Sequence, residues 1–248
     1  LAAEGITFDH AFSNAPVCSV ARSTLISSSY APRIGVQFHR RSALVPLPQN
    51  HRMFPSYLRD AGYYTSNNSK EDYNAFKGPD VWDESSNKAS YRNREQGQSF
   101  FHVQNFGTTH EGQLFFTAEQ MANEPTQTAP ATVRVPDYLP DTPLFRYTVA
   151  RYLDLQMKMD AEVGKFIAQL EADGVLDNTI IFYYGDHGGI MPRSKGYAYE
   201  TGLHIPLVVR APAKWQHLVH KQPSTRDDTF VGFVDFGATV LNLAGVDV

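Results

Sequence analysis

Apolar and polar positions alternate along the chain with two periods, one typical of strands and one typical of helices. Short apolar runs bounded by turn residues predict strands at 6–12, 63–68, 99–106, 179–184 and 205–212. Apolar residues spaced three to four apart predict helices near 19–28, 49–62, 146–170 and 229–245. Because strands alternate with helices, we expect an α/β fold with a mostly parallel, doubly wound open sheet and helices on both faces.

One segment breaks this alternation. Residues 117–145 contain five prolines, which is too many for a helix or a central strand, so we predict a long surface crossing there. At the amino end, "LAAEG" resembles the last turn of a helix closed by Gly5. At the other end, the chain stops just past an amphipathic helix. We therefore expect residues 1–248 to be a single domain truncated at both ends.

Composition excludes several classes of partner. The 248 residues carry 22 Lys and Arg against 26 Asp and Glu, a net charge of −4, so no general positive field attracts nucleic acid or an anionic membrane. The longest apolar runs are far shorter than the roughly 20 residues of a membrane span. The single cysteine cannot form an intrachain disulfide.

Polar residues that directly follow apolar strands are the first candidates for chemistry, because ligands of open α/β sheets bind at the carboxyl ends of the strands. The candidates are the segment Cys18–Arg22, then Lys70, His110 and the pair Asp186-His187. Lys195 lies further along the loop that follows this pair.

Cys18 and Arg22 are four positions apart at the start of a predicted helix, so they share one helix face. A helix N-terminus and an arginine together form an anion site and lower the pKa of a thiol. The other interpretation is a buried inert cysteine beside a surface arginine, and the spacing alone favours it.

The remaining candidates are also ambiguous one by one. Asp186 and His187 could be two metal ligands, an acid/base pair or part of a plain turn. Lys70, Lys195 and His110 are donors suited to a tetrahedral oxyanion and to protonation of its leaving group, but each alone is more often a solvated surface residue.

Taken together and in this order, the segments resemble the type I sulfatases of the alkaline phosphatase superfamily. "APVCSVARSTLISSSYAPRIGV" resembles the sulfatase signature, which begins C-x-P-S-R. "IIFYYGDHGG", "RSKGYAYETGLHIPLVVRAP" and "FVDFGATVLNLAGV" resemble three later segments of the family. The resemblance spans nearly the whole chain, is nearest to the heparan N-sulfatase branch, and implies an alkaline phosphatase-like α/β sandwich.

The resemblance implies that the formylglycine-generating enzyme converts Cys18 to formylglycine, whose hydrated aldehyde attacks sulfur and then expels sulfate. Arg22 would hold the formylglycine hydroxyl. Asp186, His187 and the modified residue 18 would bind a divalent cation, usually Ca²⁺ in this family. Lys70 and Lys195 would bind sulfate, and His110 would assist the leaving group.

A sulfated carbohydrate is the substrate that the resemblance implies, hydrolysed at an O-sulfate or N-sulfate. His204 would face the sulfate or the sugar, or have a structural role. The aromatics Tyr63, Tyr73, Trp82 and Tyr91 could stack on sugar rings, although each alone is more often a core or surface residue. By analogy with the family, we expect a periplasmic, secreted or lysosomal location.

The sequence departs from the family pattern at several positions. Val20 and Ala21 replace the proline and serine of the signature, and Ser28 replaces a later glycine. Asp72 stands where the family often has a histidine. The family's first strand, with the Asp-Asp pair that completes the metal shell, would precede residue 1, so we expect the chain as given to bind metal poorly and to be inactive.

Two alternatives stay open. The same cluster of charges suits a phosphoester or phosphonate monoester hydrolase of the same superfamily, because the anions have similar size and shape. The altered residues Val20 and Ala21 also allow a pseudoenzyme that binds sulfated glycans without turnover.

Overall fold

Two structural units make up the chain in the computed structural model, which describes residues 1–40 and 43–247. The first unit consists of Leu1–Asn105 together with Thr179–Val248, and the second is Phe106–Asn178. The assignment of the whole chain to one catalytic domain stays a prediction.

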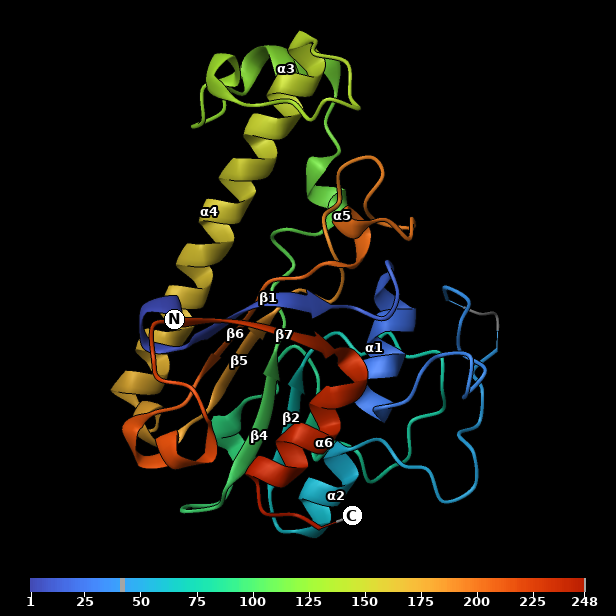
Figure 1. Ribbon diagram of the computed structural model, residues 1–248, viewed down its shortest axis with the longest axis vertical. Helices are drawn as coiled ribbons and strands as arrows, with labels where there is room; N and C mark the ends of the chain where they lie inside the picture. Colours follow the sequence, from blue (N-terminus) through green and yellow to red (C-terminus); the bar gives the residue numbers. More distant parts are fainter. Residues whose placement is uncertain (41–42, 248) are drawn as a thin grey trace. The chain divides into compact units, whose positions relative to one another are not determined.

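A four-stranded sheet organises the first unit (Figure 1). β6 runs antiparallel to both β5 and β1, whereas β1 and β7 are parallel. It follows that β5, β1 and β7 all run in the same direction. The spatial order is β5 (Ile181–Tyr184), β6 (Leu207–Arg210), β1 (Ile6–Phe12) and β7 (Thr225–Gly232).

A second, three-stranded sheet lies in the same unit and is parallel throughout. Its order is β3 (Glu84–Ser85), β2 (Tyr64–Asn68) and β4 (Phe100–Gln104). β2 and β4 pair in register from Tyr64↔Phe100 to Asn68↔Gln104, so they end at the same edge.

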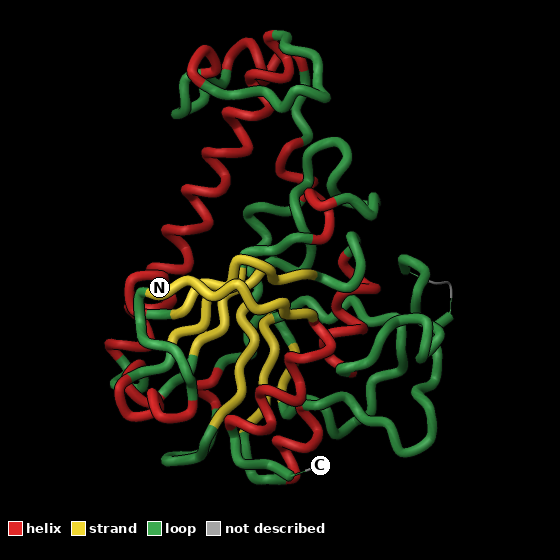
Figure 2. The backbone as a smooth tube through the Cα atoms, in the orientation of Figure 1, coloured by secondary structure: helices red, strands yellow, loops and turns green. Residues whose placement is uncertain are grey.

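Three helices pack with these strands around one hydrophobic core: α1 (Cys18–Ser27), α2 (Pro55–Asp60) and α6 (Phe233–Leu243). Figure 2 shows them as the helical segments beside the strands of this unit. Each contributes fully buried side chains, Ile26 from α1, Leu58 from α2 and Phe233 from α6. A short helix, α5 (Glu200–Leu203), precedes β6. The predicted α/β fold is therefore confirmed for the sheets and the helices that follow them.

The second unit centres on the long helix α4 (Pro143–Ala172). The predicted helix began at Arg146, but α4 begins one turn earlier because the side chain of Thr142 accepts a hydrogen bond from the Phe145 amide and Pro143 suits the first helical position. The carboxylate of Asp154 on α4 accepts the amides of Gln127 and Thr128 at 2.7 and 2.9 Å. These bonds hold the preceding segment against the helix.

The prediction that residues 117–145 lack a helix is wrong. α3 (Ala118–Asn123) forms there, because Thr117 and Gln120 make a reciprocal capping box at its amino end. The prolines of the segment lie outside this helix, so they do not oppose it.

The predicted closing helix over 229–245 is partly wrong. Its first four residues, 229–232, belong to β7, and the helix α6 starts at Phe233. Phe230 and Val231 pair with His10 and Ala11 of β1. The hydrophobic pattern of this short run fits either a strand or a helix. Pairing with β1 makes it a strand.

Among the described residues, none of the helices combines the length and the apolar character that crossing a membrane requires.

Candidate active site

The strand directions bring distant segments to one edge of the four-stranded sheet. β1 and β5 end at the edge where β6 begins, as the pairs Phe12↔His204 and Tyr184↔Leu207 show. Cys18 follows β1, Asp186 and His187 follow β5, and His204 precedes β6. This edge is where an open α/β sheet binds its ligands.

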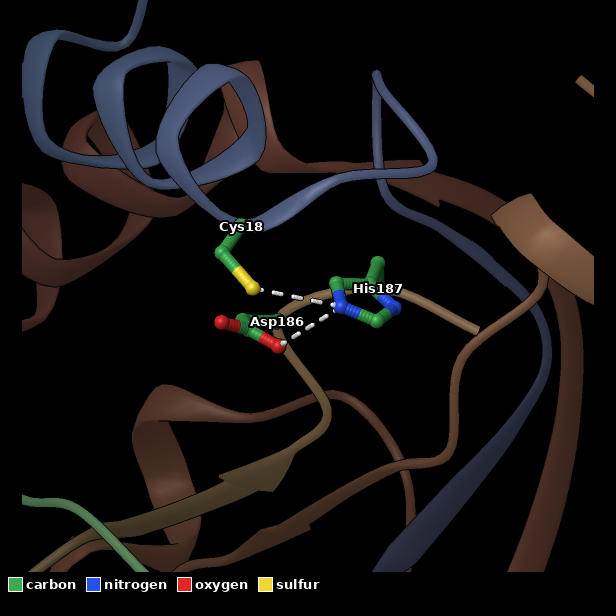
Figure 3. Close-up of side chains that lie close together, drawn as sticks. All are labelled: Cys18, Asp186 and His187. Carbon is green, nitrogen blue, oxygen red and sulfur yellow. Dashed lines mark hydrogen bonds and ion pairs between the residues drawn. The ribbon is translucent and has the colours of Figure 1, made fainter. Parts of the chain in front are cut away.

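Cys18 is the first residue of α1 and is 1% exposed. Its Sγ lies 3.4 Å from Nε2 of His187 (Figure 3). The unpaired amides of a helix N-terminus favour an anion at this position. The predicted placement of the cysteine at a helix start is confirmed.

Arg22 lies one turn further along α1 and connects three segments. Its Nε donates to Oδ2 of Asp186 at 2.8 Å, and its Nη1 donates to the Lys70 carbonyl oxygen at 3.0 Å and to Oδ1 of Asn105 at 2.9 Å. Sequence reasoning missed Asn105, which directly follows β4. Its place after a strand is the signal that could have identified it.

Lys70 follows β2 and reaches the same carboxylate. Its Nζ lies 3.4 Å from Oδ2 of Asp186 and 3.8 Å from Oδ2 of Asp72. Asp72 also receives two hydrogen bonds from Arg40, both 3.1 Å long. Asp72 thus forms an ion pair with Arg40 and lies near Lys70.

Asp186 is held in its ionised form. Burial raises the pKa of Asp186, but the charge of Arg22, the charge of Lys70 and the Arg22 hydrogen bond together act in the opposite direction and are stronger. Its pKa therefore lies well below the usual range, and the carboxylate keeps its negative charge throughout the neutral range.

His187 is neutral at pH 7. Burial lowers the pKa of His187 and outweighs the charge of Asp186 and the Gly188 hydrogen bond, which raise it, while the positive charges of Lys195 and Lys70 add to the lowering. Its Nδ1 lies 2.9 Å from the Gly188 carbonyl oxygen, which assigns the proton to Nδ1. The lone pair on Nε2 is left facing Cys18.

Cys18, Asp186 and His187 form a group that could hold a metal ion, with one potential ligand atom each and all three atoms within 4.8 Å of one another. Figure 3 shows the three side chains converging, Cys18 from the start of α1 and the other two from the loop after β5. An ionised carboxylate and a neutral imidazole are suitable donors for a divalent cation. Three donors are fewer than the six to eight that Ca²⁺ takes, so substrate, water or further groups must supply the rest.

The loop after His187 is fixed by close backbone contacts. The amides of Gly188 and Gly189 donate to the carbonyl oxygens of Gly202 and Thr201 at 2.9 and 2.8 Å. A Cβ at Gly202 would overlap the carbonyl oxygens of Tyr197 and Ser194, so only glycine fits there. This packing holds Lys195 close enough to lower the pKa of His187.

His204 lies at the same edge. Its ring stacks on Phe12 at a centroid distance of 5.1 Å, and its Nδ1 is 3.1 Å from Oε1 of Glu200. His110 belongs to the second unit, where its side chain accepts a hydrogen bond from the Gly112 amide at 3.3 Å. The structure therefore groups the predicted site residues of the first unit, and the role of His110 stays a prediction.

Two of the four aromatics considered for sugar stacking are buried core residues. Trp82 and Tyr91 are 7% and 1% exposed, and burial raises the pKa of Tyr73. Tyr63 and Tyr73 are partly buried and pack against the core. Stacking on sugars is not supported for Trp82 and Tyr91, whose rings stack on Phe101 and Phe100. For Tyr63 and Tyr73 it stays a prediction.

Comparison with known proteins adds independent information. The sequence model of the Sulfatase family matches residues 1–246. An ulvan-active sulfatase of Formosa agariphila is 35% identical over 288 residues, which cover 99% of this chain and 47% of the relative. The N-acetylglucosamine-6-sulfatase of Homo sapiens is 33% identical over 97 residues, covering 37% of this chain and 16% of the relative. The chain thus spans less than half the length of these two relatives.

Solved structures share the fold. A phosphonate monoester hydrolase of Agrobacterium radiobacter superposes with a TM-score of 0.71 at 13% identity, over 99% of this chain and 68% of that one. A protein in complex with its substrate D-glucosamine-2-N,6-O-disulfate superposes with a TM-score of 0.67 at 17% identity, over 100% of this chain and 71% of that one. These likenesses support the alkaline phosphatase-like α/β fold that the sequence predicts.

Proposed function

Because the chain belongs to the sulfatase family, we propose that the full-length protein hydrolyses sulfate esters or N-sulfates of carbohydrates. One observation carries the proposal: Cys18 at the start of α1 shares a cluster with Asp186 and His187, which come from the other end of the chain. The helix start, together with a divalent cation that Asp186 and His187 would hold at the same edge, would provide the charges that a tetrahedral sulfuryl group requires.

Cys18 is the precursor of the nucleophile in this proposal, and the formylglycine-generating enzyme is the partner that modifies it. A formylglycine at this position supplies an oxygen nucleophile for sulfur and divides one difficult displacement into two easier steps. The buried start of α1 holds the side chain in one place beside His187. Val20 and Ala21 lie within the segment that the modifying enzyme must recognise.

Asp186 and His187 are the residues that would hold the cation, with Ca²⁺ as our first choice. Such a cation neutralises charge on the sulfate oxygens. Arg22 keeps Asp186 ionised and oriented, and the Gly188 carbonyl oxygen keeps the proton of His187 on Nδ1. Both arrangements prepare ligand atoms for a metal before it binds.

Lys70 and Lys195 are the cations that would bind the sulfate oxygens, and His204 would contact the sulfate or the sugar. His110 is the proposed donor of a proton to the leaving oxygen or nitrogen. The names of the relatives, which refer to ulvan and to N-acetylglucosamine, support a polysaccharide substrate. A periplasmic, secreted or lysosomal location is proposed by analogy with the family.

The test compares initial rates of the full-length protein on sulfated oligosaccharides, on an aryl sulfate and on an aryl phosphate and phosphonate. We expect sulfate release from at least one saccharide and a clear preference for sulfate over phosphate. A preference for the phosphorus esters would instead identify a phosphoester or phosphonate hydrolase. Tight glycan binding without release of either anion would identify a non-catalytic binder.

A further inference from the structure

The loop between β5 and α5 carries cationic and aromatic side chains at alternate positions. They are Arg193, Lys195, Tyr197 and Tyr199, and the loop is drawn in orange next to α5 in Figure 1. Tyr197 and Tyr199 are 57% and 48% exposed, in contrast to the buried aromatics Trp82 and Tyr91. Single exposed aromatics are common on protein surfaces, but two in one loop with two cations directly before them need an explanation.

The two tyrosine rings form one exposed platform. Their centroids are 6.3 Å apart and their planes differ by 19°, which is an offset stack. The guanidinium carbon of Arg193 lies 4.4 Å from the centroid of Tyr199. This arrangement combines a flat apolar surface, two phenol hydroxyls and a positive charge.

Hydrogen bonds to backbone carbonyl oxygens hold the platform beside the candidate active site. The amide of Gly196 donates to the carbonyl oxygen of Pro16 at 2.8 Å, two residues before Cys18. The Thr201 hydroxyl donates to the Arg193 carbonyl oxygen at 2.7 Å, and the Gly202 amide donates to that of Tyr199 at 2.9 Å. Contacts at Arg193, Gly196 and Tyr199 therefore limit the movement of the loop relative to Cys18.

Lys195 lies between the platform and the site along the loop, because the next residue, Gly196, bonds through its amide to the Pro16 carbonyl oxygen, two residues before Cys18. Tyr197 and Tyr199 follow Lys195 by two and four residues, which is at most about 7 and 14 Å of extended chain. A saccharide whose sulfate is bound next to Lys195 therefore has its neighbouring rings within reach of the tyrosines.

We propose that Tyr197, Tyr199 and Arg193 form a second saccharide-binding subsite, which selects oligosaccharides carrying another sulfate or carboxylate near the sulfate that is hydrolysed. The proposal rests on the proposed sulfatase function and deepens it. The apolar face of a sugar ring packs on an aromatic ring, while sugar hydroxyls bond to phenol oxygens. The planar guanidinium of Arg193 pairs with a sulfate or carboxylate oxygen pair.

The experiment uses the full-length enzyme with the single substitutions Tyr197→Ala, Tyr199→Ala and Arg193→Gln. Trp215→Ala is the matched control. Trp215 also lies under a cation, with Nζ of Lys214 4.6 Å from its ring centroid, but it follows the carboxyl end of β6 at the opposite edge of the sheet. The substrates are size-defined ulvan and heparin hexasaccharides, and inorganic sulfate is used as a competitive inhibitor.

We expect each tyrosine substitution to raise KM for the preferred hexasaccharide about tenfold and to leave kcat nearly unchanged. The inhibition constant of inorganic sulfate should change less than about twofold, because sulfate alone does not reach the platform. Arg193→Gln should raise KM about threefold and weaken its dependence on salt. Trp215→Ala should alter none of these constants.

A binding measurement separates this proposal from the proposed function. In a Cys18→Ala background, which cannot turn over substrate by the proposed route, the dissociation constant of the hexasaccharide should rise about tenfold on adding Tyr197→Ala. An unchanged constant in a folded variant overturns the subsite, even if the enzyme is an active sulfatase. If Tyr197→Ala weakens binding but the full-length protein with Cys18 intact releases no sulfate, the subsite is retained and the catalytic proposal is rejected. If Tyr197→Ala does not fold, Tyr197→Leu, which keeps the apolar volume and removes the flat ring, provides the same comparison.

Discussion

The sulfur of Cys18 lies 3.4 Å from Nε2 of His187, although 169 positions separate the two residues in the chain. Two parallel strands produce this contact, since β1 and β5 both end at the edge where the residues lie. The imidazole is neutral and has its lone pair toward the sulfur. The contact therefore brings the proposed nucleophile and a potential metal ligand together.

Replacing the cysteine tests the nucleophile. Cys18→Ala should lower kcat on a sulfated saccharide by about 10³-fold or more, since the precursor of the nucleophile is removed. The free energy of unfolding should fall by only about 1 kcal/mol, because alanine fits the buried helix start. Rate assays and urea unfolding of the full-length protein measure the two effects.

Mass spectrometry of the peptide spanning residues 14–33 should show formylglycine in place of cysteine in the active parent. An active protein with an intact thiol would contradict the mechanism.

Replacing Arg22 tests the electrostatics of Asp186. Arg22→Gln should lower the free energy of unfolding by about 2–3 kcal/mol, because a mostly buried carboxylate loses the nearer of its two ionic partners and keeps only Lys70. This loss of stability is smaller than that expected for a fully buried ion pair, because the side chains of Arg22 and Asp186 are 18% and 22% exposed. Activity should fall as well, because Asp186 loses its orientation.

Arg59→Gln is the control for this prediction. Arg59 pairs with Asp83 at 2.7 Å, but its side chain is 36% exposed, so its removal should cost less than about 1 kcal/mol. Equal losses of stability in the two variants would refute the buried role of Arg22.

Metal removal tests the cation site. EDTA treatment of the full-length protein should abolish activity, and added Ca²⁺ should restore it. Calcium at about 100 times its dissociation constant should stabilise the fold by about 2.7 kcal/mol, measured as a rise in the thermal midpoint. Asp186→Asn should remove this stabilisation, whereas Asp60→Asn, at an exposed ion pair with Arg52, should preserve it. A calcium effect that persists in Asp186→Asn places the ion elsewhere.

Close packing of the loop before α5 predicts a steric effect at Gly202. Gly202→Ala should lower both stability and kcat, because the added Cβ overlaps two carbonyl oxygens and displaces the segment carrying Lys195. We expect a destabilisation of about 2 kcal/mol or more. Gly164→Ala on α4 is the control, since nothing lies within 4 Å of its added Cβ. It should raise helix stability by about 0.5–1 kcal/mol.

Stability should also depend on pH through His102 on β4, which is separate from the site cluster. Burial lowers the pKa of His102, whose Nδ1 lies 2.8 Å from the Ser66 hydroxyl oxygen. As pH falls, His102 gains a proton in the unfolded chain before it does so in the folded protein. Its contribution to the free energy of unfolding is therefore fully present above the unfolded pKa of about 6.5. It is lost as pH falls through the lower folded value. Urea unfolding between pH 7.5 and 5 should therefore show declining stability, and His102→Gln should flatten the decline. Identical slopes for the two proteins would rule out this assignment.

The sequence predicted the local elements well where a pattern has one interpretation. Strands β1, β2, β4, β5 and β6 and the helix α1 lie where the apolar runs placed them. Proline counts misled the prediction for 117–145, because the capping box at Thr117 starts a helix between the prolines. The run at 229–232 was misassigned because its strand character depends on pairing with β1.

The sequence by itself determined which chemical groups the site contains: the thiol, the carboxylate, the imidazole and the cations, each after a predicted strand or at a helix start. Only the tertiary structure decided which of these groups bond to one another, such as Arg22 to Asp186 and Asn105. It also decided that Tyr197 and Tyr199 are exposed. The physical reason is the distance along the chain over which each kind of interaction acts. Capping and periodicity act over a few residues, whereas these contacts join segments 83 and 164 positions apart and depend on strand direction and register.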